Sequence, residues 1–256
     1  MSKKPGNTSR RNGDGARSTR LLTIALAVGA LILLCYYYSG SVSQSFFIGG
    51  FSSNIRSTSG VEGDFSCTLE VQNAIPVLKK AYGDSMHKVL HVGPDSCSVI
   101  TKLLKEDETE AWGVEPYDTE DADNHCKSLV RKGIVRVADI KFRLPYRAKS
   151  FSLVIVSDAV DYLSPKYLNK TLPDLARVSA DGVVVFAGLP GQQRAKTAEV
   201  SKFGRPAKLR SSSWWVRFFV QTNLEENESA IKKFQQAAVK SAYIPGCQVF
   251  HLKSYN

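Results

Sequence analysis

The sequence predicts an α/β domain in which a mainly parallel sheet carries helices on both of its faces. Short apolar runs alternate along the chain with amphipathic stretches of helical period, the order that parallel strands and their crossover helices produce. The run 151–156 (FSLVIV) is nearly free of polar residues, as in a strand buried on both faces. With 43% hydrophobic and 23% charged residues, the composition excludes a collagen, a low-complexity chain and a disulfide miniprotein.

The first half of the domain is expected to contain three strands separated by helices. Ser66 can cap a first helix that ends at Gly83, with Pro76 as a kink inside it. The strands are expected at 88–92, 111–114 and 134–138, and the intervening helices at 97–105 and 121–132.

The second half begins with the buried strand 151–156. Helical pieces are expected over 165–179, with 169–173 as a candidate break because Pro173 lacks a backbone N–H. The pattern continues with a strand at 183–187, a turn at 188–191, a helix at 229–241 and a closing strand at 247–253. No strand can be recognised between Gly191 and Glu226, so the sequence leaves the far edge of the sheet open.

The segments in front of the domain have the pattern of a membrane anchor. Residues 1–20 carry six cations and one acid, a net charge of +5 out of +10 for the whole chain. Residues 21–38 carry no charge and are just long enough to cross a bilayer as a helix. The positive-inside rule then predicts a cytosolic tail, a signal-anchor at 21–38 and a lumenal remainder. The alternative is a cleaved signal peptide, which typically has a shorter apolar core and a small-residue site where this chain has three tyrosines.

Residues 39–64 are rich in Ser and Gly and are expected to form a lumenal stem before a domain at 65–256. The four cysteines of that domain allow three disulfide pairings in an oxidising lumen, or they remain buried thiols: Cys67, Cys97, Cys126 and Cys247. No CxxC pair occurs, so no metal site is predicted. Two lumenal sequons make Asn169 and Asn227 candidate glycosylation sites.

Three predicted strand ends carry residues that suit an adenosine ligand, which such sheets bind at the carboxyl ends of their strands. Glu115 can accept hydrogen bonds from ribose hydroxyls, and Asp139 can bind the adenine amino group. Only Gly93 remains of the dinucleotide fingerprint and no Walker loop occurs, so a ligand with one ribose and no phosphate, such as S-adenosylmethionine, is predicted. The candidate cofactor contacts are Val92, Gly93, Pro94, Asp95, Glu115, Pro116, Asp139, Ile140 and Asp158.

The stretches 87–130, 136–196 and 201–227 resemble the plant cotton-Golgi-related proteins, and the resemblance covers nearly all residues from 60 to 256. The spacing of the three strand ends is similar to that of class I methyltransferases. Together the resemblances imply a Rossmann-like class I methyltransferase sheet behind a single transmembrane helix in the Golgi membrane. The activity they imply is methyl esterification of homogalacturonan carboxylates in wall biosynthesis, with pectin-synthesising glycosyltransferases as candidate partners. Some descriptions of this family use the word methylesterase.

The residues favour a transferase over an esterase. An esterase needs an activated nucleophile or a carboxylate pair; no G-x-S-x-G occurs, although Asp158 and Asp161 could be offered as a pair. A uronic acid is already ionised, so methyl transfer to it needs alignment rather than a strong base. Asp158, Tyr162 and His91 are therefore expected to position groups, and the alternative for His91 is a core or loop histidine.

The basic segment 194–217 is a candidate acceptor site. It holds seven cations against Glu199 alone, and cations bind the carboxylates of a polyuronate. The expected contacts are Arg194, Arg205, Lys208, Arg210, Trp214 and Arg217, with the tryptophan stacking on a sugar. The alternative is a solvated basic face with tryptophans in the core. Nucleic acid is not expected as a partner of a lumenal domain.

Three functions remain open from the sequence. The first is an S-adenosylmethionine-dependent pectin carboxyl methyltransferase. The second is a non-catalytic partner, a methyltransferase-like scaffold for other Golgi enzymes. It remains open because Gly93 is the single glycine left of the fingerprint after the first predicted strand. The third is a pectin methylesterase.

Overall fold

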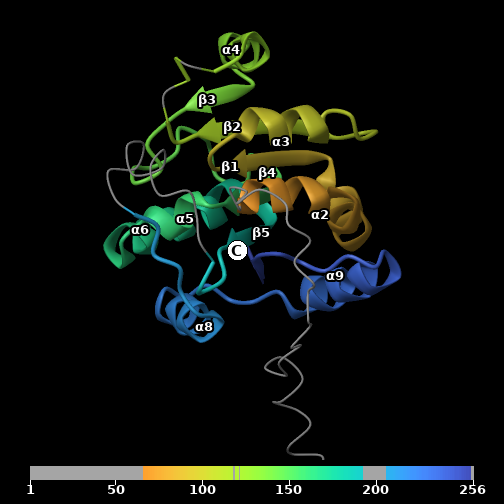
Figure 1. The fold of residues 1–256 in the computed structure, drawn as a ribbon, viewed down its shortest axis with the longest axis vertical. Helices are drawn as coiled ribbons and strands as arrows, with labels where there is room; N and C mark the ends of the chain where they lie inside the picture. The colour runs from red at the N-terminus through yellow and green to blue at the C-terminus, as the bar shows by residue number, and fades with distance from the viewer. Residues whose placement is uncertain (1–65, 118, 121, 193–205, 255–256) are drawn as a thin grey trace, which may run out of the picture. The chain divides into compact units, whose positions relative to one another are not determined.

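The computed structural model describes residues 66–117, 119–120, 122–192 and 206–254. They build a six-stranded sheet of order β3-β2-β1-β4-β5-β6 (Figure 1). The strands are β1 (Lys88–Val92), β2 (Glu110–Glu115), β3 (Val135–Val137), β4 (Phe151–Ser157), β5 (Ser179–Ala187) and β6 (Gln248–Leu252). The first five run parallel, and β6 pairs antiparallel with β5. The predicted α/β architecture is confirmed, and the predicted closing strand forms the far edge.

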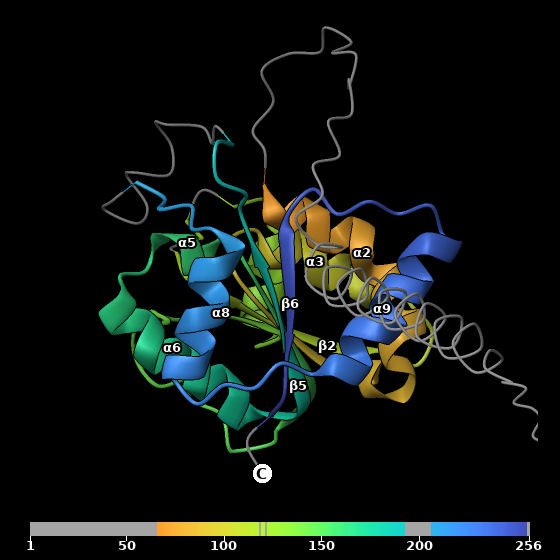
Figure 2. The same ribbon diagram turned by 90° about the horizontal axis from the view of Figure 1, so that it is seen from below.

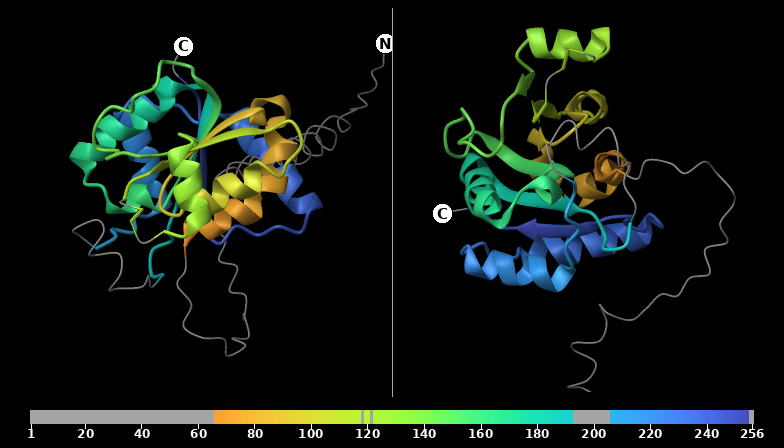
Figure 3. Two further views of the ribbon diagram at one scale, coloured as in Figure 1. Left: turned by 90° about the horizontal axis from the view of Figure 1, so that it is seen from above. Right: turned by 60° about the vertical axis from the view of Figure 1, so that its left-hand side comes forward.

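Helices cover both faces of this sheet. One face carries α2 (Cys67–Tyr82), α3 (Ser96–Leu103), α4 (Asn124–Arg131) and α9 (Glu228–Lys240), and the other carries α5 (Ala159–Tyr162), α6 (Pro165–Val178) and α8 (Ser212–Gln221). Figure 2 shows α6 and α8 on one side of β5 and β6, and α2 and α9 on the other; Figure 3 shows the layers from two further directions. A short 3-10 helix, η1 (Gly83–Met86), leads from α2 into β1.

The two layers give two apolar cores, and β4 contributes to both. Its seven residues are all buried, with Leu153 and Ile155 in the α2 layer and Val154 and Val156 in the α6 layer. This alternation follows from the two-residue period of a strand. Because each fully buried aliphatic side chain contributes about 1.5–3 kcal/mol, the central strand holds the two layers together.

The strand order reverses between β1 and β4. From β1 the chain moves outward through β2 to β3, then returns to the other side of β1 to form β4. In open parallel sheets, the crevice at the carboxyl ends of such a strand pair is the usual place for a ligand.

One local prediction is corrected by the structure. The expected break at 169–173 does not occur, since α6 continues through Pro173 while Leu168, Leu172 and Leu175 hold its inner face in the core. The stretch between Gly191 and Glu226, in which no strand could be recognised, contains α8 and no strand among its described residues. There Trp215 is fully buried, whereas Trp214 stacks on Phe218 one turn later, so adjacent tryptophans use the inner face and the flank of one helix.

The predicted tail (1–20), signal-anchor (21–38) and stem (39–64) lie outside the described residues. Within the part of the chain that the structure describes, every helix is too short or too polar to cross a membrane.

The four cysteines of the domain form two disulfides. Cys67 pairs with Cys247 across 180 residues of chain, and Cys97 pairs with Cys126 across 29. This settles the open choice between thiols and disulfides, and selects one of the three pairings. Cys67–Cys247 joins the start of α2 to the residue before β6, so it connects the first and last elements of the described fold.

We predict that Cys67→Ala with Cys247→Ala destabilises the domain more than Cys97→Ala with Cys126→Ala. In the chain-entropy model a longer closed loop restricts the unfolded state more, by about 5 kcal/mol for the long loop and about 3.6 kcal/mol for the short one. Urea unfolding of the full chain under oxidising conditions measures both losses. Cys35→Ser, which changes neither pair, serves as the control. Equal stability of wild type and the first double variant would show that this bond does not form.

Candidate functional site

A hollow of about 610 Å³ opens beside the carboxyl ends of β1 and β2, between α3 and α4. Its size lies in the usual range for small-molecule sites. Predicted cofactor contacts in its lining are Pro94, Asp95 and Glu115, and the remaining lining residues are Cys97, Ser98, Thr101, Tyr117, Thr119, Ala122, Asp123, His125 and Cys126. We call it the Glu115 hollow.

Glu115 ends β2 and points its carboxylate at the start of α3. The side chain is buried, and its Oε2 accepts a hydrogen bond of 3.0 Å from the backbone N–H of Ser96. The hydroxyl of Ser96 lies 2.8 Å from the Gly93 carbonyl oxygen and 3.0 Å from that of Val114, so it joins the ends of β1 and β2. A buried acceptor at a helix start is thus held in place where the sequence predicted a ribose contact.

Gly93 lies where the backbones of β1 and β4 approach each other closely. A β-carbon at this position would lie 2.7 Å from the Ser157 carbonyl oxygen and 2.8 Å from its hydroxyl. The glycine is therefore required by the close approach of β4, whether or not a ligand is near. Val92 before it is fully buried, while Asp95 adopts a left-handed conformation (φ 54°) that turns the chain into α3.

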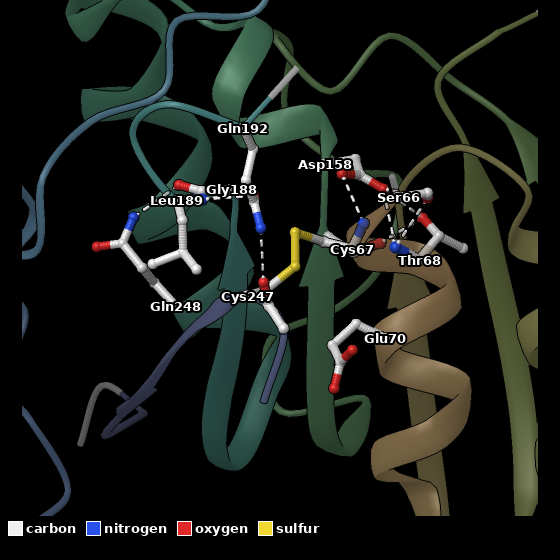
Figure 4. Close-up of a disulfide and its surroundings, with 12 residues drawn as sticks. Ser66, Cys67, Thr68, Glu70, Asp158, Gly188, Leu189, Gln192, Cys247 and Gln248 are labelled. Atoms are coloured by element: carbon white, nitrogen blue, oxygen red, sulfur yellow. Dashed lines mark hydrogen bonds between the residues drawn. A yellow bond between two sulfur atoms is a disulfide. The ribbon is translucent and has the colours of Figure 1, made fainter. Parts of the chain in front are cut away.

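The crevice between β1 and β4 is filled by the start of α2. Asp158, just after β4, accepts hydrogen bonds from the backbone N–H groups of Cys67 (3.0 Å) and Thr68 (2.8 Å) and from the Ser66 hydroxyl (2.8 Å), as Figure 4 shows. The Thr68 hydroxyl lies 2.8 Å from that of Ser157 and donates to the Pro94 carbonyl oxygen at 3.0 Å. The buried Asp158 carboxylate thus holds a helix of the same chain, and this corrects its predicted role as a cofactor contact and positioning residue.

His91 is a core histidine in this structure, the alternative considered from the sequence. Its fully buried ring lies between two hydroxyls, with Nδ1 2.9 Å from Ser96 Oγ and Nε2 3.0 Å from Ser157 Oγ. Burial disfavours the charged imidazolium and lowers the pKa of His91 to about 3. Tyr162, in α5, is buried as well and does not line the Glu115 hollow. Neither side chain is among the residues that line that hollow.

The third strand end lies at the same edge but faces away from the hollow. Glu115 is in register with Val137 of β3, so Asp139 follows close to it in the fold. The carboxylate of Asp139 pairs with Lys141 at 3.1 Å, however, and Ile140 is buried in the α6 layer. Asp139, Ile140 and Pro116 are absent from the residues that line the hollow.

The walls of the hollow contain residues that the sequence did not single out for a ligand. Cys97 of α3 and Cys126 of α4 both line it, and their disulfide fixes the two helices against each other. The Thr101 hydroxyl lies 2.8 Å from His125 Nε2 and adds a second link between the same helices. One of the three disulfide pairings left open by the sequence, Cys97 with Cys126, was the signal that could have placed α4 beside α3.

The basic segment is only partly described, because Arg194 and Arg205 lie outside the described residues. Arg210 is 4% exposed, and its guanidinium donates to the carbonyl oxygens of Val160 (3.3 Å) and Leu163 (2.6 Å). It fastens the β4–α6 connection and is not accessible to a polymer, which corrects its predicted role. Lys208 and Arg217 are exposed, and Trp214 is half-buried under Arg210, whose guanidinium carbon lies 4.7 Å from the ring centre.

The two candidate glycosylation sites lie on different elements. Asn169 is exposed on α6. Asn227 caps α9, where its Oδ1 accepts a hydrogen bond of 3.1 Å from the Ala230 N–H. An N-linked sugar replaces a hydrogen on Nδ2 and leaves this acceptor intact, so the cap is compatible with modification.

No family model matches the chain. Two curated proteins of Arabidopsis thaliana do. "Probable pectin methylesterase CGR2" is 66% identical over 99% of this chain and 99% of that protein. "Probable pectin methylesterase CGR3" is 69% identical over 93% of this chain and 90% of that protein. The chain belongs to this cotton-Golgi-related family. The resemblance seen in the sequence is thereby confirmed over nearly its whole length.

Solved methyltransferase structures are similar to the chain at low identity. A geranyl diphosphate methyltransferase with bound SAM is 12% identical, with a TM-score of 0.45 over 74% of this chain and 87% of that one. A Burkholderia thailandensis 1,6-didemethyltoxoflavin-N1-methyltransferase with S-adenosylhomocysteine is 11% identical, with a TM-score of 0.49 over 73% and 79%. With TM-scores below 0.5, these matches assign neither a ligand nor a residue role to the present chain.

We predict that His91 makes the domain less stable as the pH falls. Between a pKa of about 6.5 in the unfolded chain and about 3 in the folded one, only the unfolded chain binds the proton, so each pH unit removes up to about 1.4 kcal/mol. His91→Asn should be less stable at pH 7 but should lose less stability between pH 6 and pH 4. Urea unfolding at several pH values measures this slope, and the exposed His87→Asn is the matched control. An unchanged slope in His91→Asn would contradict the buried neutral ring.

Proposed function

We propose that the chain is an S-adenosylmethionine-dependent carboxyl O-methyltransferase that acts on the galacturonate carboxylates of homogalacturonan. The observation that carries the proposal is the buried Glu115 carboxylate at the end of β2, lining a hollow next to the point where strand order reverses. The printed names of CGR2 and CGR3 support pectin as the substrate class.

The residues of the Glu115 hollow fit the nucleoside part of this cofactor. Glu115 offers carboxylate oxygens to ribose hydroxyls, and Tyr117 offers a ring beside which adenine can lie. When bound, S-adenosylmethionine supplies an electrophilic methyl group, which a carboxylate oxygen can accept without any proton transfer. The protein then has to hold the acceptor carboxylate oxygen in line with the methyl group and to exclude water. The burial of His91 and Asp158 agrees with this, because the chemistry requires no general base.

We place the protein in the Golgi membrane as a single-pass type II protein with residues 65–256 in the lumen. Two disulfides within the described residues support an oxidising compartment. The uncharged run 21–38 behind a basic tail supports the anchor, and homogalacturonan and pectin-synthesising glycosyltransferases are the partners expected there.

A non-catalytic scaffold is the second candidate, and one observation favours it. The start of α2 fills the crevice between β1 and β4, where Thr68 bonds to both Pro94 and Ser157. A ligand that extends from the Glu115 hollow toward β4 would have to lie over this helix start. Loss of cofactor binding with retention of fold is the expected property of such a scaffold.

A methylesterase is the third candidate, because the relatives carry that word in their names and Ser157 lies 3.0 Å from His91. A serine nucleophile must be reached by the ester, however, and Ser157 is fully buried. The carboxylates suggested as a pair are engaged as well: Asp158 holds α2, and Asp161 accepts a hydrogen bond of 2.9 Å from the Gly188 N–H.

We predict that the full chain, purified in mild detergent, binds S-adenosylhomocysteine and transfers a labelled methyl group to de-esterified homogalacturonan. Glu115→Gln should weaken binding about 10- to 100-fold, because a hydrogen bond to a charged group contributes about 1.5–3 kcal/mol. Titration calorimetry measures the affinity. The matched control is Glu110→Gln, which changes an exposed carboxylate at the other end of the same strand and should bind like wild type.

Three results separate the candidates. Binding without methyl transfer would support the scaffold. Methanol release from esterified pectin in the absence of a methyl donor would support the esterase. Equal affinity of Glu115→Gln and wild type would overturn the site assignment.

A further inference from the structure

A second hollow, of about 570 Å³, lies between α6 and the connection that joins β3 to β4. We call it the α6 groove. Lys141, Phe142 and Arg143 line it from the connection, and Lys170, Asp174 and Arg177 line it from α6. It belongs to the layer opposite α2 and α9, and it shares no lining residue with the Glu115 hollow.

The floor of the α6 groove is fastened by a network around Asp174. The carboxylate of Asp174 accepts 2.7 Å hydrogen bonds from the backbone N–H of Leu144 and from Nε of Arg177. Arg177 also donates to the carbonyl oxygens of Tyr146 (2.8 Å) and Leu144 (3.2 Å). The irregular connection is thereby fixed to the helix, and the groove has a defined shape before any ligand arrives.

The lining of the groove is basic. It contains four cations, Lys141, Arg143, Lys170 and Arg177, and one carboxylate, Asp174. Arg143 is 75% exposed, and its shortest distance to the Asp174 carboxylate is a long 4.0 Å. Lys170 is exposed as well, and within the described part of the chain no carboxylate pairs with it. These two side chains can therefore exchange water for a ligand carboxylate at little desolvation cost.

Phe142 adds an apolar surface between these cations. Its side chain is 71% exposed, although single exposed apolar residues are common on proteins. Here the ring shares the groove with Arg143 and Lys170, so one ligand can meet a flat apolar face and two positive charges at once. A uronic acid offers this combination, because its ring has C–H faces and its rim bears a carboxylate.

One end of the groove reaches the edge of the sheet that holds Glu115. Lys141 pairs with Asp139 just beyond the carboxyl end of β3, and β3 lies beside β2. The other wall, α6, starts beyond the carboxyl end of β4 and runs about 21 Å toward the opposite edge. An extended chain that leaves the groove past Lys141 would therefore reach the carboxyl edge of the sheet, on the face opposite the Glu115 hollow.

We propose that the α6 groove binds the acceptor, a chain of uronic acid residues with free carboxylates. This rests on the proposed function for the reaction itself, but the binding can be measured without it. Methyl esterification removes the negative charge of each residue. The groove would accordingly hold unmodified chain more tightly than product, which favours release after transfer.

The test is the binding of fluorescent, de-esterified oligogalacturonate to the full chain with no methyl donor present. Arg143→Glu with Lys170→Glu should weaken binding about tenfold, which corresponds to about 1.4 kcal/mol. The matched control is Lys232→Glu with Lys233→Glu, which makes the same charge change on exposed positions of α9 in the other layer. An equal loss in both variants would show that only net charge matters, and would overturn the groove.

A second variant tests the sugar rather than the charge. Phe142→Ala should weaken binding of oligogalacturonate but leave binding of polyglutamate, which has carboxylates and no sugar rings, unchanged. Fully methyl-esterified oligogalacturonate should not bind to wild type. Equal displacement of oligogalacturonate by polyglutamate, sulfated glycan or single-stranded nucleic acid would show a general polyanion surface and contradict the proposal.

Absence of acceptor binding in the α6 groove is distinguishable from absence of the proposed methyltransferase activity. Normal S-adenosylhomocysteine binding and methyl transfer in the Arg143 and Lys170 double variant, with wild-type acceptor affinity, would reject the groove and keep the enzyme. Groove binding without cofactor binding would reject the enzyme and leave a polyuronate-binding protein.

Discussion

The bond between the Asp158 carboxylate and the start of α2 is the contact on which the arrangement of the site depends. Asp158 has a positive φ of 47°, rare outside glycine, and its buried charge is satisfied by the first amides of α2. The positive end of the helix favours the same anion. This contact sets where α2 covers the crevice between β1 and β4, and it brings Cys67 to the position from which it bonds to Cys247. The Glu115 hollow lies on the other side of β1, toward β2 and α4.

Two kinds of rigid frame therefore surround the candidate site. On the β4 side, hydroxyl and carboxylate groups bond to one another, with His91 held neutral between Ser96 and Ser157. On the α4 side, the covalent bond between Cys97 and Cys126 fixes the walls. A hollow framed in this way is largely formed before a ligand arrives, and less of the binding free energy is spent on ordering the protein.

Patterns that repeat within one element were sufficient to predict most of the fold. The run 151–156 is nearly continuous in apolar residues because β4 is covered on both faces, and Glu115 could be placed because parallel strands end at one edge. Contacts between distant residues could not be predicted in this way. Asp158 bonds to residues about 90 positions earlier, Gly93 is required by Ser157, and Arg210 is buried by the β4–α6 connection. Each of these looked like a ligand residue from its local sequence alone.

The long span of the Cys67–Cys247 bond has a consequence for biosynthesis. The first thiol emerges from the ribosome well before its partner, and Cys97 and Cys126 appear in between. The shorter bridge can close while synthesis continues, whereas Cys67 has no correct partner until Cys247 has been synthesised. The long bridge is therefore the later of the two to close, and a thiol–disulfide isomerase can correct mispairing of Cys67 in the meantime.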